Sequence, residues 1–279
     1  AVGQQIRNLE DYLGVELLKR HPNGSKPTSR AEQVAEDLSR HMTGLADVLA
    51  RLKQTEAPHR VSVSVLPSFA EGWLSGHLAT LFSQLPGIDL RLDASRNIAS
   101  LTDGVHDFAI RYAREPSPDL NSELLLDDYC APVCTPDFAS RYTLSPNDNS
   151  LAGVPMAEID FDELESSGVV PGLIDWCNQF DVAPPQPQSG QVILSYGAGV
   201  KMATSGLAIF LTGLHDIIDE LEDGDVLLPF GRDRVLLNEH KFWLVWRKDK
   251  RLSGIQKKFV SWISERAAND RSRIEHFTP

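Results

Sequence analysis

Strand-like and helix-like patterns alternate from residue 60 onward, and this alternation limits the possible folds more than any other feature of the sequence. Residues 61–66 (VSVSVL) alternate apolar and polar side chains as a half-buried strand does, and residues 67–82 continue with apolar side chains at helical spacing. Strand patterns return at 88–92 and at 107–112. This order predicts a βαβαβ unit in an α/β protein with a mainly parallel sheet.

A second set of elements is predicted over roughly 135–240. It contains one long stretch, 145–190, that we expect to be irregular because Gly, Pro and Ser recur there without a helical or strand period. A strand and a closing helix complete the chain. The economical architecture is two lobes joined by two crossings, near 131–135 and 240–246.

The composition excludes several classes of protein. No apolar run approaches the roughly 18 residues of a membrane helix, so we expect no membrane partner. Cys130, Cys134 and Cys177 are too few and odd in number for a disulfide framework, and the opening residues lack the pattern of a secretory signal. We therefore expect a cytoplasmic protein.

The first residues have the pattern of an amphipathic helix. Apolar side chains at 2, 6, 9 and 13 follow helical spacing, and Gly14 supplies a stop. Gln4, Gln5 and Arg7 would lie on the outward face. Residues 15–20 then form a strand pattern, and 21–27 form a Pro/Asn/Gly turn with basic neighbours, which predicts a short β-wing. An ordinary surface helix followed by a basic hairpin remains the alternative.

Charge is unevenly distributed between this region and the rest of the chain. The net charge is −12, but residues 1–30 carry five Lys or Arg against three acids. Most of the acidic surplus lies after residue 60. Any contact with nucleic-acid phosphates is therefore expected near the N-terminus.

A long helix is predicted between this region and the α/β region. Thr28 can cap it, and its apolar side chains from Val34 to Leu52 recur every three or four residues, as in a seam that a partner helix covers. A lone helix packed on its own domain is the alternative. Residues 55–59 (TEAPH) end the pattern as a hinge.

Several motifs resemble LysR-type transcriptional regulators. AVGQQIRNLEDYLGVELLKR at 1–20 resembles the recognition helix and following strand of that family, and DGVHDFAIRY at 103–112 resembles a signature of its effector domains. DYCAPVCTP, SGLAIF, EDGDVLLPF and FWLVW follow in the family's order. The match is nearest the subgroup that includes the glycine-cleavage activator and the β-lactamase-gene regulator. Gly3 departs from the family's usual Ser.

The resemblance implies an α/β chain with a partial winged helix-turn-helix, a linker helix and a two-lobed effector domain of the type 2 periplasmic-binding-protein fold. The implied domains are the winged-helix part at 1–28, the linker or dimerisation helix and hinge at 29–57, and the effector-binding domain at 58–279. Its lobe I is expected at 60–131 and 246–279, and lobe II at 132–245. By the same resemblance, about thirty further residues are expected before Ala1.

The resemblance also implies two sites. One is an interface with double-stranded DNA, formed by Gln4, Gln5, Arg7, Lys19, Arg20, Asn23 and Lys26. The other is an effector site in the cleft between the lobes, formed by Ser68, Phe69, Asn97, Tyr112, Thr135, Ser195, Tyr196 and Phe242.

Two helix N-termini are expected to face that cleft, because ligands of open α/β sheets bind beyond the carboxyl ends of the strands. Ser68 and Glu71 have the spacing of a capping box, and Ser195 begins the second helix. Helix N-termini favour anions, so a small anionic metabolite is the first expectation. An amino acid, an aromatic acid or a peptide fits the same neighbours. Ser68 as a simple cap and Phe242 as ordinary core are the structural alternatives.

The function expected is regulation of transcription, in a homodimer or homotetramer whose geometry on DNA changes when the effector binds. A solute-binding receptor with the same two-lobed fold is the alternative. The sequence lacks a nucleophile elbow, a P-loop and a zinc-protease motif, so we expect no enzyme, no cofactor and no metal site. Cys130 and Cys134 lie four residues apart, which leaves a redox pair open beside buried packing.

Overall fold

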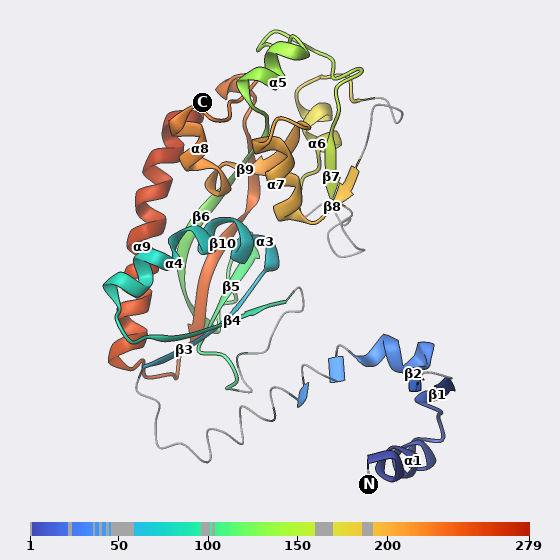
Figure 1. Ribbon diagram of the computed structural model, residues 1–279. Coiled ribbons are helices and arrows are strands. Elements are labelled where there is room, and N and C mark those ends of the chain that lie inside the picture. The colour runs from blue at the N-terminus through green and yellow to red at the C-terminus, as the bar shows by residue number, and fades with distance from the viewer. Residues whose placement is uncertain are drawn as a thin grey trace. The chain divides into compact units, whose positions relative to one another are not determined.

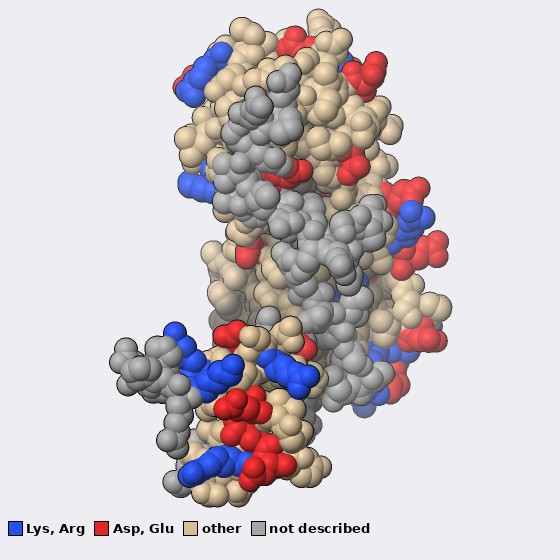
Figure 2. Space-filling model, turned by 90° about the vertical axis from the view of Figure 1, so that its right-hand side faces the viewer, with Lys and Arg blue, Asp and Glu red and all other residues tan. Residues whose placement is uncertain are grey.

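The computed structural model describes residues 2–21, 24–35, 37–38, 41–42, 45, 59–95, 101, 104–159, 170–185 and 192–279. The chain divides into two compact units, Ala1–Ala57 and Pro58–Pro279. The elements of each unit are labelled in Figure 1. On the face drawn in Figure 2, basic and acidic side chains are interspersed over the molecule's surface.

The first unit begins with the predicted helix, α1 (Val2–Leu13). Gly14 ends it with a φ of 65°, a left-handed conformation that glycine adopts without steric cost. The Glu10 carboxylate accepts hydrogen bonds from the backbone N–H groups of Leu17 (2.7 Å) and Leu18 (3.0 Å). These two bonds lower the pKa of Glu10 and attach the helix to the strand that follows.

The predicted wing is an antiparallel hairpin of β1 (Leu18–His21) and β2 (Gly24–Pro27). Its register places Lys19 directly opposite Lys26. Thr28 then caps the next helix as predicted, because its hydroxyl accepts a hydrogen bond from the backbone N–H of Ala31. Residues 29–35 are helical, whereas most of the predicted linker helix and hinge up to residue 57 lies outside the described residues.

The second unit is built on a six-stranded sheet in the order β4-β3-β5-β10-β6-β9. Its strands are β3 (Arg60–Val65), β4 (Asp89–Ala94), β5 (Phe108–Ala113), β6 (Leu120–Val133), β9 (Phe210–Gly213) and β10 (Leu236–Arg247). The β3–β4 and β3–β5 pairs are parallel, whereas β10 pairs antiparallel with both β5 and β6, and β6 pairs antiparallel with β9. The prediction of a mainly parallel sheet was therefore wrong, because β9 and β10 run opposite to the other four strands and make three of the five pairings antiparallel.

Asp107 anchors the start of β5 within the sheet. Asp107 accepts hydrogen bonds from the backbone N–H and the hydroxyl of Ser62, at 2.8 and 3.0 Å, and pairs with Lys250. This contact fixes the start of β5 beside β3. The second helix of the predicted βαβαβ unit would lie between β4 and β5, where residues 96–100 and 102–103 are outside the described residues.

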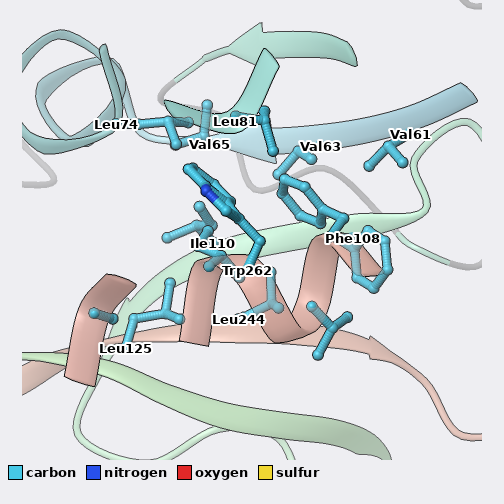
Figure 3. Close-up of a cluster of buried hydrophobic side chains, with 14 of the residues drawn as sticks. Val61, Val63, Val65, Leu74, Leu81, Phe108, Ile110, Leu125, Leu244 and Trp262 are labelled. Atoms are coloured by element: carbon cyan, nitrogen blue, oxygen red, sulfur yellow. The ribbon is translucent and has the colours of Figure 1, made fainter. Parts of the chain in front are cut away.

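The first core lies between this sheet and the helices that cover it (Figure 3). Trp262 of α9 (Gly254–Ile274) packs there among fully buried strand residues such as Val63, Ile110 and Leu244. The helices α3 (Pro67–Phe69), η1 (Ala70–Leu74) and α4 (Ser75–Gln84) contribute Phe69, Trp73 and Leu81. Burial of each large apolar side chain contributes about 1.5–3 kcal/mol.

The helix after β3 does not begin as predicted. Pro67 occupies its first turn with Leu66 as N-cap, so Ser68 lies inside the helix and makes no capping hydrogen bond. Proline suits that position because its φ is already helical and its missing N–H would be unpaired there anyway. The capping-box prediction for Ser68 and Glu71 was therefore wrong. The helix then widens into the π-helical turn η1.

The second lobe contains two further clusters. The second core includes Cys134, Phe138, Trp176 and Ile209, and the third core includes Val133, Phe210 and Leu214. Their surrounding elements are α5 (Pro136–Arg141), β7 (Ala157–Ile159), α6 (Leu173–Gln179), β8 (Val192–Leu194), α7 (Tyr196–Thr204), η2 (Leu214–Asp216), α8 (Ile218–Asp223), η3 (Arg232–Arg234) and η4 (Glu275–Phe277). Because β7 and α6 form within 145–190, the prediction of an irregular stretch there was wrong in part.

Three elements extend through both lobes. Strand β6 contributes Leu126 to the first core and Val133 to the third, and β10 runs antiparallel beside it. Helix α9 runs lengthwise along one side of the second unit (Figure 1). Its Phe259 lies in the first core and its Ile274 in the third. No helix among the described residues is long and apolar enough to span a membrane.

Candidate functional site

A cavity of about 220 Å³ lies between the first core and the second-lobe clusters. Its walls come from both lobes: the loop and helix after β3, the middle of β6, the start of α7, and the β9–η2 segment. Six of the eight predicted effector residues line it, namely Ser68, Phe69, Tyr112, Ser195, Tyr196 and Phe242. Six side chains that are far apart in the sequence and were predicted to share one site therefore line the same cavity.

The other two predicted residues do not join them. Thr135 caps α5, where its hydroxyl accepts a hydrogen bond from the backbone N–H of Phe138 at 3.3 Å, and it is not among the residues that line the cavity. A helix cap was the better interpretation for that Thr because Pro136 occupies the first turn. Asn97 lies outside the described residues.

Asp128 on β6 is a buried acid in the wall of the cavity, and the sequence analysis did not select it. The Tyr112 hydroxyl and the Cys130 thiol donate to its carboxylate, the thiol at 3.2 Å. The Asn238 amide donates to the Tyr112 hydroxyl at 2.5 Å and to Asp128 Oδ2 at 3.4 Å. All of these donors are electrically neutral.

Asp216 on η2 is the corresponding acid of the second lobe. The Tyr196 hydroxyl donates to its Oδ2, and the Thr212 hydroxyl lies 2.8 Å from the Tyr196 oxygen. His215 Nε2 is 3.4 Å from Asp216 Oδ2. The Nδ1 of His215, which is 5% exposed, has no hydrogen-bond partner among the described residues.

The two acids act on the groups around them. Burial raises the pKa of Asp216, and the nearby charge of Asp128 adds to the rise, while His215 and the Tyr196 hydroxyl act in the opposite direction. Burial and the charge of Asp128 raise the pKa of Tyr112 and of Cys130, and burial and the charge of Asp216 raise that of Tyr196. Both tyrosines are therefore neutral hydrogen-bond donors.

Two glycines let acids of one lobe approach the backbone of the other. A Cβ placed on Gly72 of η1 would lie 2.1 Å from Asp216 Oδ1, and a Cβ on Gly197 of α7 would lie 3.0 Å from Glu71 Oε2. The chain's own carboxylates thus lie near both helical segments that were expected to face an anion. The lining contains four acids, Glu71, Asp128, Glu158 and Asp216, and no Lys or Arg among its described residues.

The sequence contains only a weak indication that Asp128 and Asp216 belong to a site. Asp128 interrupts the apolar run LLLDDYCAPV, and Asp216 follows the buried strand FLTG by three residues. Polar side chains that directly follow or interrupt buried strands tend to mark ligand clefts in α/β proteins. Their mutual proximity depends on the pairing of β6 with β9, which local pattern does not reveal.

The cysteines and histidines give no sign of redox or metal chemistry in the described part of the chain. Cys130, Cys134 and Cys177 are buried free thiols. Burial raises the pKa of Cys134 to about 12 and that of Cys177 to about 11, so these thiols resist the ionisation that a redox pair needs. No group of three potential metal ligands occurs among the described residues.

The predicted DNA-contacting side chains lie on the first unit. Gln4, Gln5 and Arg7 are exposed on α1, where Arg7 donates to the carbonyl of Gly3 and Gln4 donates to Asn8. Lys19 and Lys26 are exposed on the hairpin. The structure places the backbone of Arg20 in β1, and Asn23 lies outside the described residues.

Comparisons with known proteins agree with this architecture. Residues 54–268 match the family model of the LysR substrate binding domain. The glycine cleavage system transcriptional activator of Escherichia coli K12 is 28% identical over 278 residues, which cover 98% of this chain and 87% of that protein. The transcriptional activator AmpR of Rhodobacter capsulatus is 28% identical and covers 96% of this chain and 88% of its own length.

A solved structure supports the fold. The effector domain of the transcriptional regulator AmpR of Pseudomonas aeruginosa superposes with a TM-score of 0.55 at 19% identity, covering 76% of this chain and 97% of that domain. The two-lobed fold expected from the sequence is thereby confirmed, and the similarity to the glycine cleavage activator and to AmpR regulators agrees with the expected family. These relatives are regulators of transcription. The chain therefore belongs to the LysR family of transcriptional regulators.

Proposed function

We propose that this chain binds double-stranded DNA through its first unit and a small effector through the cavity of its second unit. The observation that carries the DNA proposal is the cross-strand pair of Lys19 and Lys26. Like charges directly opposite each other destabilise a hairpin, whereas an anion placed between them removes the penalty. DNA phosphates supply such an anion.

The other contacts follow from the positions of the side chains. Gln4, Gln5 and Arg7 on the exposed face of α1 address base edges in the major groove, as the recognition helix of a winged helix does. Lys19, Arg20, Asn23 and Lys26 contact phosphates along the hairpin. We propose residues 1–28 as this DNA-binding part.

Residues 29–57 are proposed to pair two copies of the chain. The predicted seam residues Val34, Leu38, Met42 and Leu45 are between 51% and 59% exposed. A row of half-exposed apolar side chains at helical spacing is stabilised when a second helix covers it. The assembly is a homodimer or a homotetramer.

The second unit is proposed to sense the effector by a change in the arrangement of its lobes, with lobe I at 60–131 and 246–279 and lobe II at 132–245. The cavity is lined from both lobes, so a ligand that contacts both favours one arrangement over others. That change alters the geometry of the assembly on DNA. The receptor alternative is not favoured, since relatives named as transcriptional regulators match this chain from its first unit onward.

The salt dependence of operator binding tests the DNA proposal. Replacing Arg20 or Lys19 with Ala should weaken binding to all sequences and reduce the slope of log K against log salt by about one unit for each lost phosphate contact. Arg266→Ala on α9 in the second unit is the matched control and should leave the slope unchanged. An unchanged slope for both hairpin variants would refute the phosphate contacts.

The effector proposal needs a separate measurement. A footprint of the bound DNA, recorded with and without candidate metabolites, should change when an effector occupies the cavity. A footprint and oligomeric state that stay constant across a metabolite screen, in a protein that still binds its operator, would contradict it.

A further inference from the structure

The charge of the cavity differs from what two helix N-termini suggest. Asp128 and Asp216 are almost completely buried in its wall, and Glu71 and Glu158 also line it. A buried carboxylate normally has a cationic partner because removing its charge from water is costly. Among the described residues, the groups that donate hydrogen bonds to Asp128 are neutral, and the ion pair of Asp216 involves only His215.

An anionic ligand in this cavity would lie close to these carboxylates. Glu71 Oε2 lies against Gly197 at the start of α7, and Asp216 lies against Gly72 in η1. The backbone donors that an anionic ligand would need are therefore next to negative charges of the protein. Electrostatic repulsion at this distance opposes the binding of a carboxylate or phosphate.

The two buried polar atoms of the described lining that have no hydrogen-bond partner, His215 Nδ1 and Asp216 Oδ1, can both accept a hydrogen bond. When His215 Nε2 donates to Asp216 Oδ2, its Nδ1 carries a lone pair, and that nitrogen has no partner among the described residues. An ammonium group has three donors and accepts nothing. Its chemistry therefore matches the acids and this imidazole.

Aromatic rings complete the match. The ring of Phe242 lies 4.7 Å from that of Phe69 and 4.8 Å from that of Tyr112, measured between centroids, and all three residues line the cavity. Aromatic faces attract cations, most strongly where water is excluded. The remaining lining is mainly apolar, with Leu66, Leu173 and Leu211 among its members.

We propose that the effector of this protein is a small molecule with a protonated amine on an apolar body, and that Asp128 and Asp216 bind the amine. This inference rests on the proposed effector function. A volume of about 220 Å³ limits the ligand to a compact one. Because one acid comes from β6 and the other from η2, a single ammonium bound by both reduces the repulsion between them and holds the two lobes together.

Matched probes test the class of ligand without knowledge of its identity. The purified 279-residue chain is titrated with benzylamine, benzyl alcohol and phenylacetate, and with butylamine, butanol and pentanoate, at constant ionic strength. Thermal shift and calorimetry then compare an amine, an alcohol and a carboxylate on the same apolar body. We expect the amines to raise the melting temperature and the carboxylates to leave it unchanged.

Isosteric variants locate the binding. Asp128→Asn and Asp216→Asn should each weaken amine binding by about tenfold to a hundredfold, as expected for loss of a charged hydrogen-bond partner. Asp233→Asn, which removes an exposed acid, should leave the affinity unchanged. Near-ultraviolet circular dichroism verifies that each variant is folded, and the comparison of probes on the unaltered chain stands if one variant is not.

Three results would overturn the proposal: stabilisation by the carboxylates rather than the amines, no shift with any amine, or full amine affinity in both Asn variants. These measurements need no DNA, so their failure leaves the DNA-binding proposal standing. Conversely, a chain that binds amines but no operator would refute the proposed function while upholding the ligand class.

Discussion

Two buried acids contact the π-helical turn η1, and their surroundings differ. Asp270 on α9 is 0% exposed and accepts hydrogen bonds from Trp73 Nε1 (2.8 Å), His77 Nε2 (2.9 Å) and Arg273 (3.0 Å). Burial would raise its pKa, but these donors lower the pKa to about 2. Asp216 has neutral donors and one histidine, and its pKa is raised. Saturation with donors makes Asp270 a structural group, whereas Asp216 has fewer donors and its Oδ1 has no hydrogen-bond partner among the described residues.

The largest effect is expected from Asp270→Asn. This substitution leaves the Trp73 indole, the His77 imidazole and the Arg273 guanidinium without the carboxylate to which they donate. Loss of one partner from a buried ion pair should lower the free energy of unfolding by about 3 kcal/mol or more. Urea denaturation measures it. Asp219 is another partner of Arg273, and the Asp219 side chain is 73% exposed. Asp219→Asn should therefore lower the free energy of unfolding by less than about 1 kcal/mol. Equal losses in both variants would contradict the distinction.

A smaller loss is expected from Gly72→Ala, because the new methyl group would overlap the Asp216 carboxylate. Displacement of that group should cost about 1–3 kcal/mol, and the loss should shrink in an Asp216→Ala background. Gly76→Ala is the control, since no atom lies within 4 Å of its Cβ position, and it should stabilise α4 by up to about 1 kcal/mol. A loss that is independent of Asp216 would refute this contact.

The two acids should affect the pH dependence of stability with opposite sign. Asp270 has a lowered pKa, so its stabilisation, about 2 kcal/mol, is present above its ordinary pKa of 3.8 and is lost as the pH falls towards 2. Asp216 has a raised pKa, so it costs stability as the pH rises above 3.8. Asp216→Asn should therefore be more stable than the unaltered chain at neutral pH, and the two curves should meet in acid. A constant difference across the pH range would contradict this.

The smallest effect is expected at the thiols. Cys130 donates to Asp128 and is buried, and burial and the nearby charge of Asp128 raise its pKa. A thiol reagent should therefore leave Cys130, Cys134 and Cys177 unlabelled until the protein unfolds. Rapid labelling of Cys130 in the native state would show that the Asp128 side of the cavity opens to solvent.

Local pattern predicted the elements whose boundaries depend on neighbouring residues. Helix α1 ends at Gly14 because its left-handed φ is a local requirement, and Thr28 caps its helix for the same kind of reason. The motif order led to the family, and six residues of the cavity followed from it. Ser68 was misplaced because Pro67 competes for the same first turn.

Long-range pairing was not predictable in this way. The run LLLDDYCAPV has no alternation, since β6 lies between β10 and β9 and is buried on both faces over its second half. Strand direction depends on which segments return to the sheet. The charge of the cavity depends on Asp128 and Asp216, which only this tertiary arrangement brings together. The sequence therefore indicated a cleft but did not reveal the buried acids in its wall.

Helix α9 has a consequence for the order in which the protein is assembled during synthesis. Its side chains complete the first core and also reach the third, although it follows every other long element in the chain. The first unit can form its hairpin while the ribosome is still translating, but neither lobe of the second unit has all of its core before residue 274 emerges. A nascent chain thus acquires the hairpin of its first unit long before the cores of its second unit are complete.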